Sequence, residues 1–296
     1  MFNLEIQLKR QLSSFRRIAL GTWRTSRDPK ALGTMDVRMD RALDYIRDFR
    51  VATGRRLTVT HLVARAVAAA LRETPDANAL LRLGRIYLRD KVSVCMQVVM
   101  TDEGENKVDL SAVTLHDAAD KSLLEIADEV EARVHRVRKR EDPALESMRR
   151  FTRLVPAPLM GLFVEAVAFF AYELNLDMSR LGLPRDAFGS IMVTNIGTLG
   201  LDVAYPPLVP YSRVPIVVAV GAATLRPVAE ESEHGEVQIV ARRVMRLSAT
   251  FDHRFVDGYH CARLAQTVRR WLESPYEYFD AIERGASELA ATGSNT

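Results

Sequence analysis

The segment Ser248-Ala249-Thr250-Phe251-Asp252-His253-Arg254-Phe255-Val256-Asp257-Gly258 lies between two different hydrophobic patterns. The short apolar run from Val244 to Phe251, which overlaps the start of this segment, predicts a strand. After it, apolar residues recur at helical spacing and predict a helix that Gly258 opens: Cys261, Leu264, Ala265, Val268 and Leu272. His253 is therefore expected on the turn between a strand and a helix.

A histidine on such a turn has the chemistry of a general base. Its pKa lies near neutrality, and it takes a proton from a thiol or hydroxyl when its surroundings hold the ring in one tautomer. A second interpretation explains the same residues, with His253 on a surface loop and Asp257 only capping the next helix. The stretch taken alone leaves both interpretations open.

Two ordered motifs favour the catalytic interpretation. Phe251 to Gly258 resembles the Asp-His-Arg-x-x-Asp-Gly signature of the dihydrolipoamide acyltransferase catalytic domain, the core of the 2-oxo acid dehydrogenase complexes and a relative of chloramphenicol acetyltransferase. Upstream, Ile191 to Gly200 is similar to the Ser/Thr-Asn-x-Gly block of that family. The segments Pro206 to Pro210, Val217 to Gly221 and Arg226 to Val228 then follow in the family's order.

The resemblance implies a fold and an assembly. Composition and periodicity alone reach only a mixed α and β protein. The family implies a chloramphenicol-acetyltransferase-like α/β fold, a two-layer sandwich of helices on a mixed sheet. It also implies a homotrimer whose active sites lie between neighbouring subunits, with His253 of one subunit facing Thr194 of the next.

The resemblance also implies a reaction. His253 deprotonates a thiol or hydroxyl acceptor, which attacks the carbonyl of an acyl thioester of coenzyme A. Thr194 donates to the oxyanion that forms, which lowers the barrier by a few kcal/mol. Asn195 holds the turn, and Asp257 orients the loop through an arginine. Arg254 is either an ion-pair partner or a contact for a CoA phosphate.

Composition restricts the class of protein. The chain has 296 residues, 48% of them hydrophobic, which is enough for a single catalytic domain over residues 1–296. A formal net charge of only +3, mixed along the chain, gives little support for nucleic-acid binding. Cys95 and Cys261 are the only cysteines and lack metal-ligand spacing, which predicts no metal and a reducing cytoplasm. The first ten residues lack the pattern of a secretory signal.

Several further elements are predicted from periodicity. Strands are expected at Met35–Met39 and Val92–Met100, and helices at Leu57–Leu71, with a threonine cap, and at Ala118–Arg138. Residues 11–27 resemble the family's N-terminal arm, where an arginine pairs with Asp257 or belongs to a solvated basic turn. Residues 104–113 depart from the family's channel-lining strand, so the acceptor stays open.

The largest departure from the family is an insertion at 141–188. It contains Arg149, Arg150 and Arg153, followed by an apolar run from Leu154 to Leu174 that Pro156, Pro158 and Glu165 interrupt. A spanning helix needs about twenty nearly uncharged apolar residues. Three interpretations remain: a helical cover on the protein's own core or at a subunit interface, a helix on a membrane surface through residues 149–174, and a lid over a long acyl pocket.

Two alternatives to a CoA-dependent acyltransferase follow from these departures. One is a membrane-peripheral acyltransferase at the inner membrane face, acting on a lipid or a carrier-bound acyl chain. The other is a non-catalytic trimeric scaffold. No lipoyl domain is recognisable in the sequence, and the involvement of a lipoyl group acting in trans stays open. A polar tail at 285–296 predicts a plain trimer without higher assembly.

Overall fold

A six-stranded mixed sheet is the centre of the molecule. The computed structural model describes residues 3–10, 29–101, 108–138, 155–232 and 235–282. The strands follow the order β2-β9-β8-β7-β5-β6. Their bounds are Lys30–Arg38 (β2), Val94–Thr101 (β5), Val108–Leu115 (β6), Ile191–Asn195 (β7), Ile216–Glu231 (β8) and Val237–Asp252 (β9). Strand β7 is parallel to both β5 and β8, and the other pairs are antiparallel.

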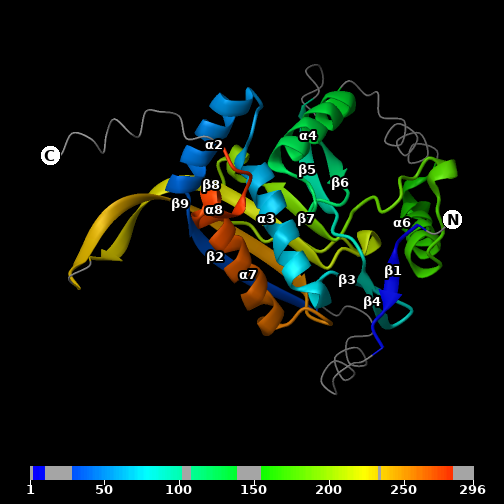
Figure 1. Ribbon diagram of the computed structural model, residues 1–296. Helices are drawn as coiled ribbons and strands as arrows, with labels where there is room; N and C mark the ends of the chain where they lie inside the picture. The colour runs from blue at the N-terminus through cyan, green and yellow to red at the C-terminus, as the bar shows by residue number, and fades with distance from the viewer. Residues whose placement is uncertain (1–2, 11–28, 102–107, 139–154, 233–234, 283–296) are drawn as a thin grey trace.

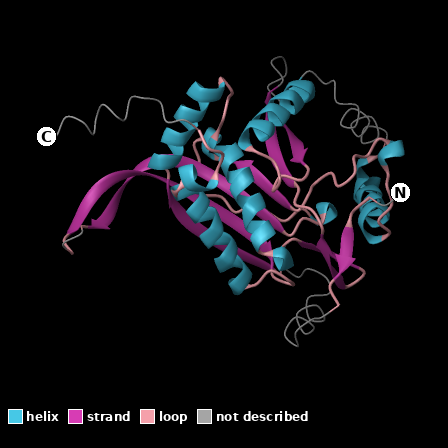
Figure 2. Ribbon diagram, viewed as in Figure 1, coloured by secondary structure: helices cyan, strands magenta, loops and turns pink. Residues whose placement is uncertain are grey.

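Helices cover one face of this sheet (Figures 1 and 2). They are α2 (Asp40–Thr53), α3 (Val59–Glu73), α4 (Leu123–Arg138), α7 (Gly258–Glu273) and the short α8 (Pro275–Tyr278). The main hydrophobic core lies between the helices and the sheet, and α3 is the most deeply buried of them, with ten buried residues. The two-layer α/β arrangement predicted from the sequence is confirmed.

Loops cover the opposite face, and a second, smaller sheet lies beside the main sheet (Figure 1). That sheet has the order β1-β4-β3 and is formed by Ile6–Leu8 (β1), Ala79–Arg82 (β3) and Arg85–Arg89 (β4). Short 3₁₀ turns lie at Pro75–Ala77 (η1), Ser179–Leu181 (η3), Gly197–Leu199 (η4) and Pro210–Ser212 (η5). The loops cover a second apolar cluster on this face, formed by Cys95, Met192, Val214 and Val217.

The predicted elements are present with shifted ends. Helix α3 begins at Val59, and Thr58 occupies the N-cap position without a side-chain hydrogen bond, so the predicted threonine cap is wrong in its chemistry. Helix α4 begins at Leu123 instead of Ala118, because the chain turns there with Asp117 in a left-handed conformation (φ 54°). The predicted arm at 11–27 and the tail at 285–296 lie outside the described residues.

The described part of the insertion forms a helix that packs on the protein itself. Helix α6 (Ala157–Ala168) continues into a π-helix, η2 (Phe169–Glu173). Ala168 and Tyr172 are buried against Leu4 and Leu80 of the small-sheet region. This is the packing that the first interpretation of the insertion predicts.

Polar contacts fasten the end of this helix. Asn175, buried and with φ 54°, receives the Leu4 backbone N–H on Oδ1 at 2.6 Å and donates from Nδ2 to the Leu4 carbonyl at 3.0 Å. Arg89 forms a buried ion pair with Asp186 at 2.7 Å. Because Leu4 and Arg89 belong to the small-sheet region, these bonds tie the insertion to residues far away in the sequence.

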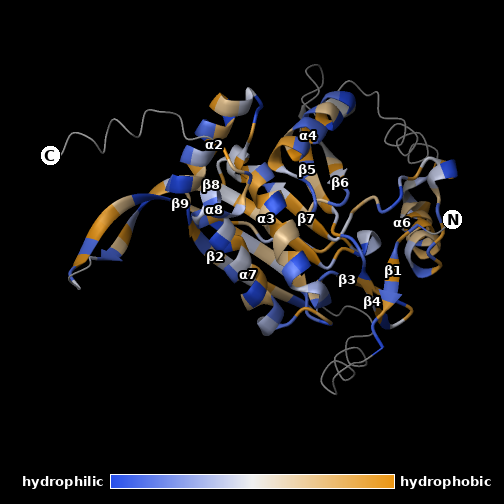
Figure 3. Cartoon of the chain, viewed as in Figure 1, coloured by the Kyte–Doolittle hydropathy of each residue, from blue (hydrophilic) through white to orange (hydrophobic). Residues whose placement is uncertain are grey.

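The outer side of the insertion is apolar as well (Figure 3). Leu159 is 54% exposed and Leu162 69% exposed. Among the residues that the structure describes, no helix is both long enough and apolar enough to cross a membrane. The subunit-interface and membrane-surface interpretations therefore stay predictions for this exposed side.

Candidate active site

The turn that carries His253 is fixed by backbone hydrogen bonds at both of its ends. The Asp252 N–H donates to the Pro215 carbonyl at 2.8 Å, and the His253 N–H donates to the Pro29 carbonyl at 2.7 Å. The chain then closes on itself, with the Val256 N–H donating to the Asp252 carbonyl at 3.0 Å. The predicted strand–turn–helix placement of His253 is confirmed.

The His253 ring is held by the same turn. Its Nδ1 lies 3.1 Å from the Val256 carbonyl oxygen. A carbonyl only accepts hydrogen bonds, so this contact places the ring proton on Nδ1 and the basic lone pair on Nε2. The side chain is half-buried, while Phe255 and Val256 beside it are buried in the core. The turn therefore holds the ring in one tautomer, with the proton on Nδ1.

Arg254 is the ion-pair partner of a carboxylate within the turn. Its Nε lies 2.9 and 3.1 Å from the two Asp252 carboxylate oxygens, and its Nη2 lies 2.5 Å from Oδ2. Asp252 is only 6% exposed. Of the two roles predicted for Arg254, the structure therefore has the ion pair, which holds the residues on both sides of His253 in one geometry.

Asp257 caps helix α7. Its Oδ1 accepts the backbone N–H groups of Tyr259 and His260 at 3.1 and 3.2 Å. The His260 Nδ1 also lies 2.6 Å from that oxygen. The capping interpretation of Asp257 is thus present in the structure. It is compatible with an orienting role, because the cap fixes where the His253 turn passes into the helix.

Thr194 and Asn195 end strand β7. Thr194 is half-buried and, because Ile191 and Val193 belong to the helix-side core, it lies on the loop-covered face of the sheet. Asn195 donates from Nδ2 to the Thr60 hydroxyl at 2.7 Å and accepts the Thr198 N–H at 3.2 Å. As predicted, Asn195 holds the turn.

Glycines keep the chain close together beyond Thr194. The Ile196 N–H donates to the Val220 carbonyl at 3.0 Å, and the Ala222 N–H donates to the Leu201 carbonyl at 3.1 Å. A Cβ on Gly221 would collide with the backbone carbonyl of Asp202. Only glycine allows this close approach, which fixes the strand end beside Thr194.

Thr194 and His253 of one chain do not share a site. Across the sheet, Thr194 is paired with Ala219, and Ala219 with Ser248. His253 lies five residues beyond Ser248, which is roughly 16 Å along the strand, and two strand spacings, about 10 Å, to the side. A site containing both residues therefore needs two copies of the chain.

Neither cysteine has the character of a nucleophile. Burial raises the pKa of the Cys261 thiol to about 11, with the negative charge of Asp257 adding to the shift. Burial likewise raises the pKa of the Cys95 thiol to about 11. Both therefore stay protonated near neutral pH. In the described parts of the chain, no three His, Cys, Asp or Glu side chains are grouped as metal ligands.

Comparison with protein families accounts for most of the chain. Residues 9–148 and 185–279 match the model of the 2-oxoacid dehydrogenases acyltransferase (catalytic domain). The chain belongs to this family. The unmatched residues 149–184 lie inside the segment predicted as an insertion.

Two curated relatives have names that fit this family. The chain is 25% identical over 222 residues to the dihydrolipoyllysine-residue acetyltransferase component of the acetoin cleaving system of Bacillus subtilis (strain 168), covering 75% of this chain and 43% of that protein. It is 41% identical over 88 residues to the lipoamide acyltransferase component of the branched-chain alpha-keto acid dehydrogenase complex of Pseudomonas putida, covering 29% and 19%. The chain thus spans less than half the length of these relatives.

Solved structures share the fold at low sequence identity. A probable dihydrolipoamide acetyltransferase from Listeria monocytogenes 4b F2365 has a TM-score of 0.61 at 17% identity, covering 94% of this chain and 99% of that one. The dihydrolipoamide acetyltransferase of Azotobacter vinelandii has 0.59 at 19%, covering 92% of each. Chloramphenicol acetyltransferase has 0.50 at 16%, covering 90% and 99%. The predicted fold class is confirmed.

Sequence reasoning missed some of the groups that build the turn. It did not predict that His260 contacts Asp257, or that the Pro29 and Pro215 carbonyls receive the two backbone N–H groups. Asp257 was readable as an N-cap residue, but His260 is not the Glu or Gln that usually completes a capping box, so this contact had no clear sequence signal. The two carbonyl contacts have no local signal.

Proposed function

We propose that the protein transfers an acyl group between a coenzyme A thioester and a thiol or hydroxyl acceptor, with His253 as the general base. The observation that carries this proposal is the 3.1 Å contact between His253 Nδ1 and the Val256 carbonyl. It fixes one tautomer before any substrate arrives, which is what a base in direct acyl transfer needs.

The proposed reaction uses residues at the ends of strands β7 and β9. His253 Nε2 removes the proton of the acceptor, whose sulfur or oxygen attacks the thioester carbonyl and forms a tetrahedral intermediate. The Thr194 hydroxyl donates to the oxyanion, and the intermediate collapses with expulsion of the CoA thiolate, which takes the proton back from the histidine. Asp257 and the Asp252–Arg254 pair keep the ring in place.

A homotrimer supplies the two halves of this site from different subunits. The separation of Thr194 and His253 within one chain supports it. A second feature is the ribbon formed by Leu225–Glu231 of β8 and Val237–Arg243 of β9, which projects beyond the sheet (Figure 1). Its side chains Leu225, Val237 and Ile239 are 60 to 79% exposed. Two-stranded ribbons are marginal alone in water, so a neighbouring subunit is the expected partner.

Names of relatives support the substrate class. The relatives from B. subtilis and P. putida are named for acetyl or acyl transfer to a lipoyl group. The crystallographic study of the A. vinelandii enzyme concerns a serine, a histidine and an asparagine in its mechanism. A lipoyl group carried by another protein is therefore the acceptor we propose to test first.

The basic experiment measures release of free CoA from acyl-CoAs with dihydrolipoamide as acceptor. We expect His253→Ala to lower the rate by about 10² to 10⁴, the usual contribution of a general base. His135→Ala, which removes an exposed histidine of α4, is the matched control and should leave the rate unchanged. Equal rates for His253→Ala and wild type would rule out the proposed base.

Mixed oligomers test the shared site. His253→Ala and Thr194→Val are each expected to be nearly inactive, but co-expressed chains should regain about one quarter of the wild-type rate, since a cyclic assembly pairs intact His253 with intact Thr194 at one site in four. If each site lay within one chain, mixing would restore nothing.

The membrane-peripheral alternative rests on the exposed apolar side of α6. Leu159 and Leu162 face solvent there, within the segment 149–174 that is predicted to lie on a membrane surface. Binding of the protein to anionic vesicles, abolished by Leu162→Glu, would support this function. Absence of binding at low ionic strength would leave the cytoplasm as the predicted location.

A further inference from the structure

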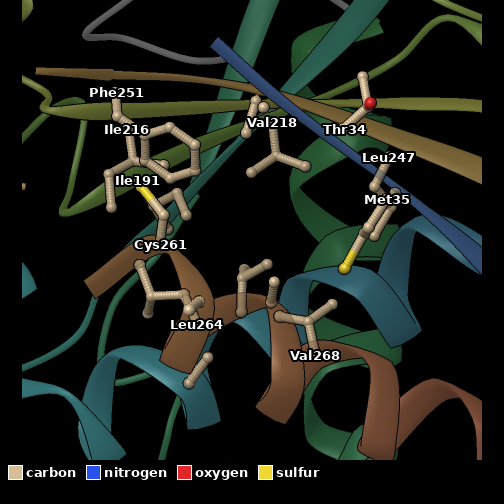
Figure 4. Close-up of a pocket in the computed structure, with 16 residues that line it drawn as sticks. Thr34, Met35, Ile191, Ile216, Val218, Leu247, Phe251, Cys261, Leu264 and Val268 are labelled. Carbon is tan, nitrogen blue, oxygen red and sulfur yellow. The ribbon is translucent and has the colours of Figure 1, made fainter. Parts of the chain in front are cut away.

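A second candidate site lies inside the subunit, between the sheet and helix α7. A cavity of about 270 Å³ is enclosed by strands β2, β7, β8 and β9 on one side and by helices α3 and α7 on the other. Figure 4 shows Phe251, Ile216, Ile191 and Cys261 around one end, and Met35, Leu247 and Val268 around the other. None of the residues proposed for acyl transfer lines it.

Small side chains create this space. Gly33 of β2, Ala249 of β9, Ala70 of α3, and Ala262 and Ala265 of α7 all line the cavity. Larger residues at these positions would close it, because apolar interiors normally pack without voids of this size. An empty apolar cavity destabilises a fold in proportion to its volume, so a filled state is favoured.

The cavity opens between β2 and α7. Its floor consists of buried residues such as Ile191 and Ile216, which are 3% and 1% exposed. Toward the edge of the sheet, Gly33 and Cys261 are half-buried and Ala262 is exposed. The entrance therefore lies beside Ala262, at the edge strand.

The lining determines the chemistry of the occupant. Apart from the Cys261 thiol, every side chain that faces the cavity is purely apolar, and none is charged. Thr34 pairs with Ser248 of the opposite face, and its hydroxyl points away from the cavity (Figure 4). Burial raises the pKa of that thiol to about 11, so it adds no charge at neutral pH. Because burying an unpaired polar or charged group is costly, a carboxylate or a phosphate would have to stay outside.

We propose that this cavity binds a hydrocarbon chain, inserted tail first between β2 and α7. An apolar cavity of about 150 Å³ holds one benzene ring, so this one holds by proportion roughly ten carbon atoms. The chain belongs either to a free alkyl compound or to the acyl group of a thioester whose polar end stays in solvent. The site is separate from the His253 turn and does not depend on acyl transfer.

Calorimetric titration of the full chain with 1-butanol, 1-hexanol and 1-octanol tests the proposal without any turnover. We expect the affinity to rise roughly tenfold for every two methylene groups that become buried. Ala265→Leu and Gly33→Val narrow the cavity from opposite walls and should each weaken 1-octanol binding at least tenfold. A Cβ at Gly33 meets only the Phe251 ring, at 3.5 Å, so Gly33→Val is the second variant if Ala265→Leu does not fold.

Gln266→Leu is the matched control, because it adds the same side chain to an exposed position of the same helix; binding should be unchanged. Equal affinities along the alcohol series, or full binding by both narrowed variants, would overturn the proposal. The proposal would also be overturned if the wild type did not bind 1-octanol and both narrowed variants lost stability. Other parts of the chain would then fill the cavity.

A second titration assigns the source of the chain. If the acyl group of a thioester occupies the cavity, octanoyl-CoA binds more tightly than CoA to the wild type, and Ala265→Leu removes this preference. If the preference survives in Ala265→Leu while 1-octanol binding is lost, the occupant is a free alkyl compound. Either result supports a hydrocarbon site.

Discussion

Along strand β9, the two faces of the six-stranded sheet bury different kinds of group. On the helix-covered face, Met245, Leu247 and Phe251 of β9 pack against apolar helices. On the loop-covered face, the alternate residues of the same strand are Ser248, Thr250 and Asp252, all buried and polar. One strand thus presents hydrocarbon to one side and hydroxyl and carboxyl groups to the other.

This difference separates the candidate site from the main hydrophobic core. Thr194 and the Asp252–Arg254 pair lie on or beside the polar face, where the candidate reaction groups are. The helix face supplies rigidity and the apolar cavity. A polar group should therefore contribute strongly to the unfolding free energy when it is buried with its partner, and weakly when it is exposed or has no partner. The following substitutions test this expectation.

The largest effect is expected at Arg254. Arg254→Met leaves the Asp252 carboxylate, 6% exposed, without its cation. Breaking such a pair from one side costs about 3 kcal/mol of unfolding free energy. Because the pair brackets His253, the acyl-transfer rate should also fall at least tenfold. Urea denaturation and rate measurements on the same protein check both.

The bidentate pair of Arg246 with Asp36 is the matched control for Arg254. Its distances, 2.6 and 2.7 Å, are as short, but both side chains are at least one third exposed. Arg246→Met should cost less than about 1 kcal/mol, since exposed pairs contribute little. Equal losses in the two variants would contradict the importance of burial on this face.

The next largest effect is expected in the insertion. Asn175→Ala removes both hydrogen bonds to Leu4 and leaves a buried N–H and carbonyl unpaired, which costs about 3 kcal/mol. The positive φ of Asn175 adds to this cost, because alanine disfavours it. Hydrogen exchange of the Leu4 amide should accelerate. Leu176→Ala, at a neighbouring residue that is 45% exposed, should leave that exchange unchanged.

The helix face was largely predictable from sequence, and the loop face only in part. Amphipathic spacing identified α3, α4 and α7, because burying one helix stripe needs only local information. The motif at His253 placed the turn. The Asn175–Leu4 and Arg89–Asp186 contacts were not predicted, because they join residues far apart in the sequence and their polar side chains carry no periodic signal.

The sequence named the candidate site residues, and the family resemblance implied that His253 faces Thr194 of a neighbouring subunit; the contacts that hold each residue were left open. His253, Asp257 and Thr194 were all named from motifs. The ion pair of Arg254 with its near neighbour Asp252 was one of two open roles. The offset between His253 and Thr194, roughly 16 Å along the strands, depends on strand register, which no residue pattern specifies by itself.

A smaller, pH-dependent effect is expected on the helix face. His61 is 7% exposed, its Nδ1 has no hydrogen-bond partner among the described residues, and burial, with Arg56 and Arg50 nearby, lowers its pKa to about 4. The unfolded chain takes up this proton near pH 6.5, so stability is complete above that pH and is lost as the pH falls toward 4. The loss at pH 5 is about 2 kcal/mol.

Replacing His61 with leucine should remove this acid sensitivity. The difference in unfolding free energy between His61→Leu and wild type should move by about 2 kcal/mol in favour of the variant between pH 7 and pH 5. His135→Leu, at an exposed position of α4, is the control and should show no such change. Parallel pH profiles for His61→Leu and wild type would disprove the assignment.

The smallest effect is expected at two buried threonines, whose replacement should change the unfolding free energy in opposite directions. The Thr250 hydroxyl, on the polar face, lacks a hydrogen-bond partner within the described residues, whereas the Thr267 hydroxyl of α7 donates to Glu73 at 2.8 Å. Thr250→Val removes an unpaired polar group and should stabilise the fold by about 1 kcal/mol, while Thr267→Val should destabilise it by about the same amount. Denaturation midpoints measure both. A loss in Thr250→Val would mean that a buried water or another group satisfies this hydroxyl, and the expected contrast between the two threonines would fail.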